Sequence, residues 1–365
     1  MKVLHIYKDY YPVIGGIENY IKILAEYQAR HGFDVTVLTT SRNGTAAIET
    51  INSVKVIRAS RLTAISSTPL SISLVRWVHK LKTDIIHLHF PYPVGEIATL
   101  FLGRAKHTII TYHSDIIKQK IMLPVIRPLL RRVLEKADRV IATSPQYIET
   151  SAFLKRVRDK CVVVPLGIDI HRFSTPDSNE SRKIRAQHGD AHLVLFVGRL
   201  RYFKGLRYLI EAMKSVDAHL LIIGTGPEGH FLKEKVKVDN LHNVKFLNDV
   251  DDNELPHYYH ACDVFVLPSS HRSEAFGTVL IEAMASGKPV ISTELGTGTS
   301  FINVHGETGF VVPARDPAAL SESLNMLLKD ESLRKEFSAH AVKRSVRFSS
   351  EVLNKRIVEL YRECQ

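Results

Sequence analysis

Residues 267–290 read LPSSHRSEAFGTVLIEAMASGKPV and contain one complete pattern of strand, loop and helix. The apolar residues that lead into this stretch predict a buried strand, and a polar loop follows it. Apolar residues at helical spacing over 276–285 predict a helix, which the Ser-Gly-Lys-Pro run at 286–289 ends. Glu274 precedes this helix and Glu282 lies inside it. Helix geometry places Glu282 about two turns along, toward the same side as Glu274.

The start of the predicted helix suits an anionic ligand, because the first turn of a helix has unpaired backbone N–H groups. Phe276, Gly277 and Thr278 supply these groups. A plainer interpretation is that Glu274 caps the helix and that Glu282 is a solvated residue on its surface. The spacing of the two acids by itself leaves both interpretations open.

The run E-A-F-G-T-V-L-I-E-A-M-A-S-G-K-P-V resembles the E-x7-E signature of retaining glycosyltransferases with the GT-B fold, in particular glycosyltransferase family 4, also called group 1. The resemblance extends over nearly the whole chain. It implies a nucleoside diphosphate sugar as donor, with Glu274 beside the transferred sugar and Glu282 on the ribose. It also implies that Ala275, Phe276, Gly277 and Thr278 line the donor site.

Length and composition predict a globular protein with two domains, since 365 residues are too many for one ordinary core. Hydrophobic residues make up 45% and charged residues 24%, and no apolar run is long enough to span a bilayer. The N-terminus lacks a signal-peptide core, and the three scattered cysteines indicate neither disulfides nor a cysteine metal site. We therefore expect a cytoplasmic protein, with peripheral association to the cytoplasmic face of the membrane left open.

Positive charge is concentrated in the first half of the chain. Residues 1–175 contain 25 Lys and Arg against 13 Asp and Glu, a net charge of +12, whereas the remainder of the chain carries −1. Such a field attracts phosphate groups on nucleic acid, on anionic lipid or on a phosphorylated substrate. Charge alone does not choose among these partners.

Residues 116–136 place part of this charge among Ile, Leu and Val side chains. The composition is typical of a membrane-surface element, and equally of an ordinary helix with a solvated basic face. Pro124 and Pro128 argue against one continuous helix, so we expect a loop and then a helix that starts near Val125. The cations of this segment are Lys118, Lys120, Arg127, Arg131, Arg132 and Lys136.

Strand and helix patterns alternate along both halves of the chain, which predicts the α/β class with parallel sheets covered on both faces. The polar segment 174–183 is the expected linker. With the family resemblance, we expect the GT-B architecture, in which two doubly wound Rossmann-like domains face each other across a cleft. The N-terminal acceptor domain would be 1–174 and the C-terminal nucleotide-sugar domain 182–347, with a C-terminal helix at about 348–365 that packs back on the first domain.

A glycine pair and a histidine mark the ligand edge of the first domain. Gly15 and Gly16 form a turn between a strand and a helix, where glycine lets backbone amides approach an anion, although a simple tight turn would look the same. His113 ends a predicted strand, and open α/β sheets bind ligands at that edge. The resemblance implies that Gly15 and Gly16 lie beside the donor diphosphate, with Gly16, Tyr112 and His113 at the acceptor. It also puts His113 near the leaving phosphate, and a purely structural role is the alternative.

His87 and His89 share one face of a predicted strand. A metal pair is one interpretation, but the sequence shows no third ligand. We therefore favour histidines of the core or of the cleft edge, and we predict no metal site.

Arg199 and Lys204 flank a predicted turn from strand to helix that begins at Gly198. Two cations at such a turn suit a diphosphate, because they neutralise charge that grows on a leaving group. An ordinary exposed pair is the alternative. The run V-G-R-L-R-Y-F-K-G-L resembles the same family, which implies that Gly198, Arg199 and Lys204 bind the donor.

A formal G-x-G-x-x-G runs from Gly224 to Gly229, and Asp249 follows at about the spacing of a dinucleotide-binding fingerprint. We interpret it as a decoy, because Pro227 is unfavourable in a tight pyrophosphate turn and the motif follows the second strand of its domain. The resemblance implies instead that the turn at Gly224 borders the nucleotide.

The resemblance also implies a reaction, which is retaining hexosyl transfer that requires neither a cofactor nor a metal. His113, Arg199, Lys204 and Glu274 are the expected catalytic residues, and Glu274 orients the sugar. GDP-mannose is the first donor we expect, because S-T-E-L-G-T-G-T-S-F is similar to loops of bacterial mannosyltransferases, and UDP-linked hexoses are the alternative. The expected acceptor is a saccharide, free or linked to polyprenyl diphosphate at the anionic inner-membrane surface, in surface polysaccharide biosynthesis.

Two other classes of protein fit parts of the sequence. A nucleic-acid-binding protein would use the same basic half, but no reading motif and no interleaved aromatic residues accompany it, so we expect no nucleic acid partner. A nicotinamide oxidoreductase would use the glycines at 224–229.

Overall fold

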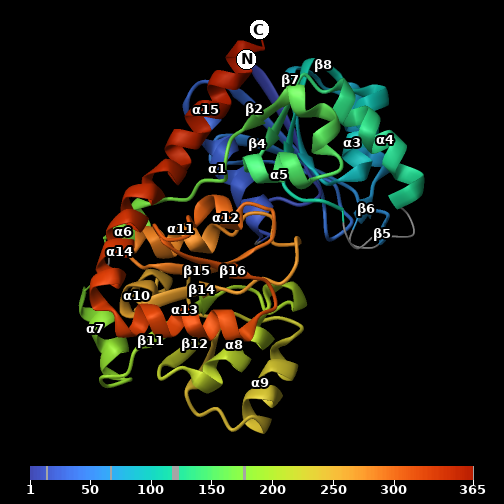
Figure 1. Ribbon diagram of the computed structural model, residues 1–365. Helices are drawn as coiled ribbons and strands as arrows, with labels where there is room; N and C mark the ends of the chain where they lie inside the picture. Colours follow the sequence, from blue (N-terminus) through green and yellow to red (C-terminus); the bar gives the residue numbers. More distant parts are fainter. Residues whose placement is uncertain (14, 66–67, 117–122, 176–177, 365) are drawn as a thin grey trace. The chain divides into compact units, whose positions relative to one another are not determined.

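The computed structural model describes residues 1–364 apart from 14, 66–67, 117–122 and 176–177. The chain forms two units (Figure 1). Unit 1 consists of Met1–Gly167 together with the segment from Glu351 to the C-terminus, and unit 2 consists of Ile168–Ser350.

The sheet of unit 1 forms from runs of Val, Ile and Leu that are buried, as expected for strands covered on both faces. Its described strands are β1 (Lys2–Ile6), β2 (Asp34–Thr40), β3 (Ala47–Ile51), β4 (Val54–Ala59), β7 (Lys82–Phe90), β8 (Arg104–Tyr112), β9 (Arg139–Ala142) and β10 (Cys161–Val163). They are ordered β10-β9-β8-β7-β1-β2-β4-β3 and pair in parallel, except that β3 is antiparallel to β4. A separate hairpin consists of β5 (Thr63–Ile65) and β6 (Thr68–Leu70).

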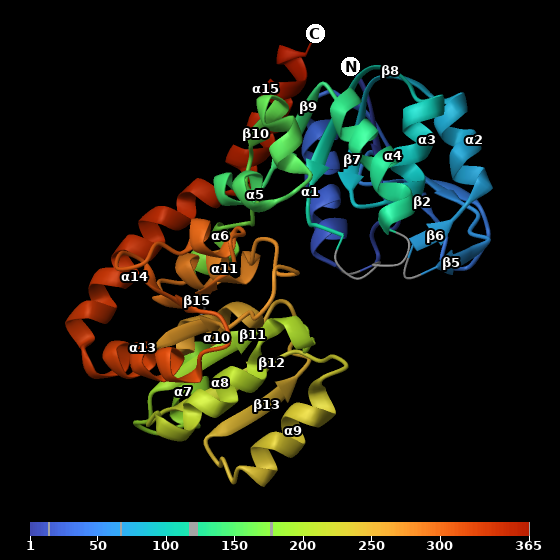
Figure 2. The same cartoon turned by 45° about the vertical axis from the view of Figure 1, so that its right-hand side comes forward.

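Helices cover both faces of this sheet. They are α1 (Gly16–Arg30), α2 (Ile72–Lys80), α3 (Pro93–Leu102), α4 (Leu123–Lys136), α5 (Pro145–Thr150), the 3-10 segment η1 (Leu154–Lys160) and α15 (Ser350–Glu363). On one face α2 packs on α3 and α3 packs on α4 (Figures 1 and 2). On the other face α1 and α15 bury apolar residues against the strands, and this cluster includes Val3, Leu24, Ile85, Ile109, Ile357 and Leu360.

Unit 2 contains a second parallel sheet. Its described strands are β11 (Leu193–Val197), β12 (His219–Ile223), β13 (Val244–Asn248), β14 (Val264–Leu267), β15 (Val290–Glu294) and β16 (Gly309–Pro313). The order is β13-β12-β11-β14-β15-β16, and each neighbouring pair is parallel. The chain therefore reverses its direction of winding between β11 and β14. In open α/β sheets, ligands bind at the carboxyl ends of the strands beside such a reversal.

The helices of unit 2 connect these strands and cover the sheet (Figure 2). They are α6 (His171–Ser174), α7 (Ser178–Ala186), α8 (Leu206–Ala212), α9 (Gly229–Val238), α10 (Leu255–Ala261), α11 (Thr278–Ala285), α12 (Thr299–Ile302), α13 (Pro317–Lys329) and α14 (Glu331–Ser345). Short 3-10 segments are η2 (Tyr202–Lys204), η3 (Met213–Ser215) and η4 (Val346–Phe348). The main helix pairs are α7 with α10, α8 with α13, and α11 with α14.

The structure differs from the sequence predictions in one place. The polar segment 174–183 does not mark the division between the units, which follows Gly167, and α6 and α7 of unit 2 take up much of it. Within unit 2, Asp330 ends α13 and caps α14. The Asp330 carboxylate accepts a hydrogen bond of 2.9 Å from the backbone N–H of Leu333.

The prediction of a helix that starts near Val125 in the basic segment is confirmed, since α4 begins at Leu123 and continues through Pro128. The loop expected before it lies largely outside the described residues. Pro124 lies in the first turn, where an N–H is not needed, and Pro128 is exposed, so that water can reach the carbonyl it leaves unpaired. Lys118 and Lys120 lie outside the described residues. Among the described helices, none has both the length and the apolar character needed to span a bilayer.

Candidate functional site

The carboxyl ends of β11 and β14 in unit 2 bring together two of the cations and acids that the sequence singled out. The loop after β11 leads to Lys204, and the loop after β14 leads to Glu274. Lys204 Nζ lies 2.7 Å from Glu274 Oε2, and the two side chains are only 13% and 9% exposed. This pair therefore lies at the reversal of winding, where open α/β sheets bind ligands.

The short turn that carries Lys204 docks directly on the loop after β14. Gly205 has a φ of +71°, and a Cβ at this position would lie 1.9 Å from the carbonyl oxygen of Pro268. The backbone N–H of Ser270 donates a hydrogen bond of 2.7 Å to the carbonyl of Phe203. Because only glycine fits here, Gly205 allows the close approach that places the Lys204 ammonium beside Glu274.

Glu274 is fixed from several sides. The Ser269 hydroxyl donates to Glu274 Oε2 at 2.9 Å, and the Thr297 hydroxyl donates to the Glu274 carbonyl at 2.8 Å. The Arg272 guanidinium donates to the carbonyls of Leu295 and Gly296, both at 3.1 Å, and so ties the two loops together. Lys204 and Ser269 therefore hold the Glu274 carboxylate, and Thr297 holds its backbone, so the residue is fixed in one position as a group that orients a ligand must be.

Arg199 differs from Lys204 in its surroundings. It is exposed, and its guanidinium has no hydrogen-bond or ion-pair partner among the described residues. Its neighbour Gly198 has a φ of +149°, and a Cβ there would lie 3.6 Å from Lys204 Nζ. The loop after β11 thus carries one cation that is already paired and one that is available to an anion.

The glycines at 224–226 have a packing role. A Cβ at Gly224 would lie 2.3 Å from the carbonyl oxygen of Gly198, and one at Gly226 would lie 2.4 Å from that of Leu200. The turns after β11 and β12 therefore touch through their backbones. This contact accounts for the glycines without a dinucleotide.

The start of α11 lies next to Glu274. Gly277 precedes the helix with a φ of +89°, and Thr278 is its first residue. The Ala275 carbonyl accepts a hydrogen bond of 2.9 Å from Gly298, while Phe276 is buried against the same glycine. The first N–H groups of α11 therefore lie beside the ion pair, at the carboxyl edge of the sheet.

Glu282, two turns into α11, is neither a capping acid nor a solvated residue. Its Oε2 accepts a hydrogen bond of 2.7 Å from the Tyr259 hydroxyl. Burial raises the pKa of Glu282, and the hydrogen bond from Tyr259 opposes that shift. Its second carboxylate oxygen is the one that a ligand hydroxyl can use.

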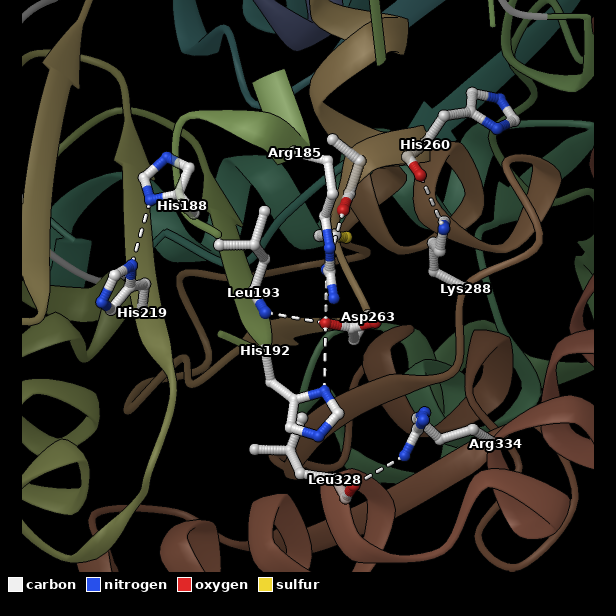
Figure 3. Close-up of polar contacts among 12 residues, drawn as sticks. Arg185, His188, His192, Leu193, His219, His260, Asp263, Lys288, Leu328 and Arg334 are labelled. Carbon is white, nitrogen blue, oxygen red and sulfur yellow. Dashed lines mark hydrogen bonds and ion pairs between the residues drawn. The ribbon is translucent and has the colours of Figure 1, made fainter. Parts of the chain in front are cut away.

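The opposite, amino-terminal edge of the same sheet holds a second polar cluster (Figure 3). Asp263 accepts hydrogen bonds from Arg185 at 2.6 Å and from the Leu193 backbone at 2.7 Å, and His192 lies 3.4 Å away. A cavity of about 270 Å³ lies beside it, and Lys288 donates to the His260 carbonyl at 2.8 Å on its border. The charged groups here satisfy one another, and the cluster joins the starts of β11 and β14.

In unit 1 the carboxyl ends of β1, β7 and β8 carry histidines, and Asp9, Arg42 and Arg61 form ion pairs just after β1, β2 and β4. His5 Nδ1 lies 3.0 Å from His89 Nε2, and His89 Nδ1 lies 3.2 Å from His113 Nε2. His87 bonds to the Tyr361 hydroxyl at 2.5 Å and to the Thr111 hydroxyl at 2.7 Å. The four imidazoles are at most 3% exposed.

Two sequence predictions about these histidines can be compared with the structure. The expectation of core histidines at 87 and 89 is confirmed by their burial, and His5 joins them as a third imidazole that the sequence did not indicate. The pairing of β1 with β7 places His5 beside His87, and the spacing of these residues in the sequence does not indicate that pairing. Tyr112 points to the other face of the sheet, where it stacks on Phe90 at 4.5 Å, so it does not join the histidines.

The glycine pair begins α1, as the sequence predicts. Gly15 precedes the helix and Gly16 is its first residue. The side chain of Glu18 folds back over this end, so that a Cβ at Gly15 would lie 2.2 Å from Glu18 Oε2. A carboxylate therefore occupies the N-terminus of α1, where an anion is favoured.

Unit 1 also contains an apolar cavity of about 410 Å³ among the hairpin β5–β6 and helices α2, α3 and α4. Val94, Ile97 and Phe101 of α3 and Ile126 of α4 contribute to its wall. On α4 the Nε atoms of Arg127 and Arg131 are buried without a partner among the described residues. Desolvation lowers the pKa of Arg131, and the nearby guanidinium groups of Arg156 and Arg127 lower it further. An apolar cavity and a group of arginines thus share one helix.

Comparisons with known proteins agree with this arrangement. Residues 177–344 match the family model for glycosyl transferases group 1, and residues 14–172 match that for glycosyltransferase family 4. D-rhamnosyltransferase WbpZ of Pseudomonas aeruginosa is 38% identical over 93% of this chain and 90% of its own. O-antigen chain mannosyltransferase C of Escherichia coli is 37% identical over 94% of this chain and 93% of its own. The solved structure of Anabaena HepE in complex with UDP shares the fold, with a TM-score of 0.80 at 22% identity over 100% of both chains.

Proposed function

The chain belongs to the group 1 glycosyltransferases of family 4 and has their GT-B fold, and on that premise we propose that it transfers a hexose from a nucleoside diphosphate sugar with retention of configuration. The proposed donor is GDP-mannose, and a UDP-linked hexose is the alternative. One relative is a mannosyltransferase and the other a D-rhamnosyltransferase. Because D-rhamnose is 6-deoxymannose, both names support a donor sugar of the manno configuration.

The observation that carries this proposal is the pairing of Lys204 with Glu274 beside the unpaired Arg199. When the sugar–phosphate bond breaks, negative charge grows on the leaving diphosphate and positive charge on the sugar ring. Lys204 and Arg199 supply the cations for that diphosphate, and the N–H groups at the start of α11 add fixed dipoles. We propose that these groups make a divalent cation unnecessary, so that transfer continues when EDTA is present.

Glu274 orients the sugar in this mechanism. Its carboxylate is held by Lys204 and Ser269, which leaves its remaining acceptor capacity for sugar hydroxyls. The departing phosphate takes the proton of the acceptor hydroxyl on the same face of the sugar, so no enzyme nucleophile is needed. Glu282 accepts a hydrogen bond from a ribose hydroxyl through the oxygen that Tyr259 does not use.

Unit 1 is the proposed acceptor unit, and the proposed acceptor is a saccharide linked to polyprenyl diphosphate in O-antigen-type glycan synthesis. The apolar cavity beside α4 suits an isoprenoid chain, because its wall is almost entirely hydrocarbon. The arginines of α4 suit the diphosphate of such a lipid, and the net charge of +12 over residues 1–175 favours an anionic membrane surface.

A donor panel tests the first part of the proposal. GDP-mannose, GDP-rhamnose and UDP-glucose are each added at the same concentration, and a ligand present at about 100 times its dissociation constant stabilises the folded protein by about 2.7 kcal/mol. We expect the two GDP sugars to raise the melting temperature by several degrees, and proton NMR to show an α-linked product from the α-linked donor. Stabilisation and turnover with UDP-glucose alone, or a β-linked product, would contradict the assigned donor or the retaining mechanism respectively.

A second experiment tests the lipid acceptor. Ile97→Asn places a polar amide in the wall of the apolar cavity, and we expect KM for a prenyl-linked acceptor to rise about tenfold. KM for a soluble acceptor without the prenyl chain should not change. Met326→Asn on α13, an exposed apolar residue of unit 2, is the matched control. Equal effects on both acceptors would show that the cavity does not bind the lipid.

A further inference from the structure

Three imidazoles in unit 1 form a single hydrogen-bonded chain that crosses the sheet. It starts at the Gln28 amide of α1, whose Oε1 lies 2.8 Å from His5 Nε2. It continues from His5 Nδ1 to His89 Nε2 at 3.0 Å and from His89 Nδ1 to His113 Nε2 at 3.2 Å. Each histidine uses both ring nitrogens except His113, whose Nδ1 is buried without a partner among the described residues.

The sheet itself lines these groups up. His5 on β1 is the register partner of His87 on β7, and His89 is the partner of Thr111 on β8. Side chains alternate between the faces of a strand, so His87 and His89 point to the same side as Thr111 and His113. The helices α1 and α15 cover that side, which seals the imidazoles from water.

Burial determines the protonation state of the three hydrogen-bonded imidazoles. Desolvation lowers the pKa of His5 to about 4 and that of His113 to about 3, and it holds the pKa of His89 well below its usual value. Each ring is therefore neutral at physiological pH and carries one N–H and one lone pair. A neutral ring that donates through one nitrogen must accept through the other.

The direction of the chain follows from Gln28. An amide oxygen only accepts, so His5 donates to it through Nε2 and keeps a lone pair on Nδ1. His89 then donates to His5 through Nε2 and accepts on Nδ1, and His113 donates to His89 through Nε2. The Nδ1 atom of His113 is left with a lone pair and no proton.

We propose that Gln28, His5 and His89 are positioning residues that fix His113 as its Nε2–H tautomer, so that His113 Nδ1 accepts a hydrogen bond from a sugar hydroxyl during transfer. This inference rests on the proposed glycosyl transfer. A buried acceptor without a partner is unfavourable in the free protein, and a ligand hydroxyl would satisfy it. Tyr20 packs edge-on against the His113 ring, with centroids 5.0 Å apart, and so helps to fix the plane of that ring.

A metal ion is the alternative use of these rings, because one nitrogen each from His5, His87 and His89 lies within 4.8 Å of the others. Both nitrogens of His87 already bond to Thr111 and Tyr361, and those of His5 and His89 are used within the chain. Binding of a metal would break these bonds. One equivalent of Zn²⁺ that protects the protein against unfolding at neutral pH would overturn the tautomer assignment.

The tautomer can be measured directly. In protein labelled with ¹⁵N in its histidine rings, we expect NMR to show His113 with its proton on Nε2. Gln28→Leu removes the acceptor at the start of the chain, and His89→Gln interrupts it, so both variants should give mixed tautomers at His113. Gln28→Glu keeps an acceptor and should preserve the tautomer. A proton on Nδ1 of His113 in the natural protein, or an unchanged tautomer in both chain-breaking variants, would refute the proposal.

Transfer rates provide the second readout. We expect kcat to fall about tenfold in Gln28→Leu and His89→Gln, with KM for the nucleotide sugar unchanged, because a wrong tautomer presents a donor where an acceptor is needed. Gln28→Glu should keep most of the activity. His219→Gln, which breaks a histidine pair in unit 2, is the matched control and should change neither the tautomer nor the rate.

The two readouts also separate failure of this inference from failure of the proposed function. If the protein transfers no sugar from any donor, transfer rates are zero in every variant, but the NMR result on the tautomer of His113 remains valid. A fixed tautomer with rates that do not respond to its loss would show that His113 Nδ1 does not take part in transfer.

Discussion

The carboxyl edges of the two sheets carry different chemistry on similar scaffolds. In unit 2 the edge presents charge, with Lys204 and Glu274 paired at 2.7 Å and Arg199 exposed nearby. In unit 1 the ions Asp9, Arg42 and Arg61 lie after β1, β2 and β4, but the end of β8 presents His113, a neutral ring whose pKa burial lowers to about 3. Both edges lie at the ends of parallel strands, so the difference comes from the side chains and from how deeply the helices cover them.

This contrast separates two tasks. A diphosphate needs cations that remain charged, and partly open loops at the end of a sheet allow that. A sugar hydroxyl needs a neutral acceptor in a fixed position, and a sealed row of imidazoles provides one. We therefore expect changes in unit 2 to affect nucleotide binding and transfer together, and changes in unit 1 to affect transfer alone.

The largest expected effect comes from Lys204. Lys204→Met removes the buried cation and leaves Glu274 without its charge partner, so we expect transfer to fall by about 10³-fold and the affinity for GDP to fall with it. Steady-state kinetics and calorimetric titration with GDP measure the two quantities.

Lys214→Met is the control for that change, because Lys214 is 40% exposed and pairs only with other surface groups. Its activity should stay within about twofold of the natural protein. Normal GDP binding by the Lys204→Met enzyme would contradict the proposed difference between the two units, because the charged edge of unit 2 would then not hold the nucleotide.

Acid should destabilise unit 1 before unit 2. His5 has a pKa of about 4 in the folded chain against 6.5 when unfolded, so the unfolded chain binds the extra proton between these values. Stability therefore falls as the pH falls from about 6.5 to about 4, by about 3 kcal/mol for this one ring. Glu96 acts in the opposite sense, because burial raises its pKa to about 8 and its contribution grows as the pH falls toward 4.5. Burial also raises the pKa of Glu18, which acts in the same sense as Glu96, so these two carboxyl groups oppose the four buried histidines.

Unit 2 lacks such a sealed row in the described residues. Burial lowers the pKa of His188 and His260, but it raises that of Glu282. Below pH 6.5 the histidines therefore make unit 2 less stable as the pH falls, whereas Glu282 makes it more stable. Trp77, the single tryptophan, lies on α2 of unit 1 and reports that unit alone. We expect its fluorescence to change at a higher pH than the circular dichroism of the whole chain. Coincident transitions would mean that the histidines do not set the acid stability of unit 1.

The next effect concerns His113. His113→Gln removes the ring acceptor, and we expect kcat to fall by about 10²-fold while the affinity for GDP stays within about twofold. Kinetics with the lipid-linked acceptor and titration with GDP test this split. An equal loss in both measurements would show that the two edges do not divide their tasks in this way.

Much of the fold could be predicted because most strands are uninterrupted apolar runs. An example is β2, in which Val35, Val37 and Leu38 are all buried. The edge strand β3 and the hairpin strand β5 were not predicted, because their residues are exposed or nearly so. An exposed strand needs no run of apolar residues that the sequence would show.

The site was less accessible to sequence reasoning. The spacing of Glu274 and Glu282 was visible, but the ion pair between Lys204 and Glu274 joins residues far apart in the sequence and depends on β11 lying beside β14. The histidine chain is similar, because Gln28 and His5 meet His89 only once α1 packs on the sheet and β1 pairs with β7. No local pattern records which strands become neighbours, so such contacts require the three-dimensional structure.

The smallest expected effect sharpens the contrast within unit 2 itself. Glu282 is the acid at the charged edge whose pKa burial raises, so it resembles the buried groups of unit 1 more than its neighbour Glu274. If it accepts a hydrogen bond from the ribose, Glu282→Gln should weaken GDP binding by about fivefold, or about 1 kcal/mol, at pH 7. The natural protein should lose a similar amount when the ribose hydroxyls are removed in 2′,3′-dideoxy-GDP, and the variant should lose nothing further, because both changes delete the same bond. Additive losses in this cycle, measured by titration calorimetry, would mean that Glu282 only anchors Tyr259.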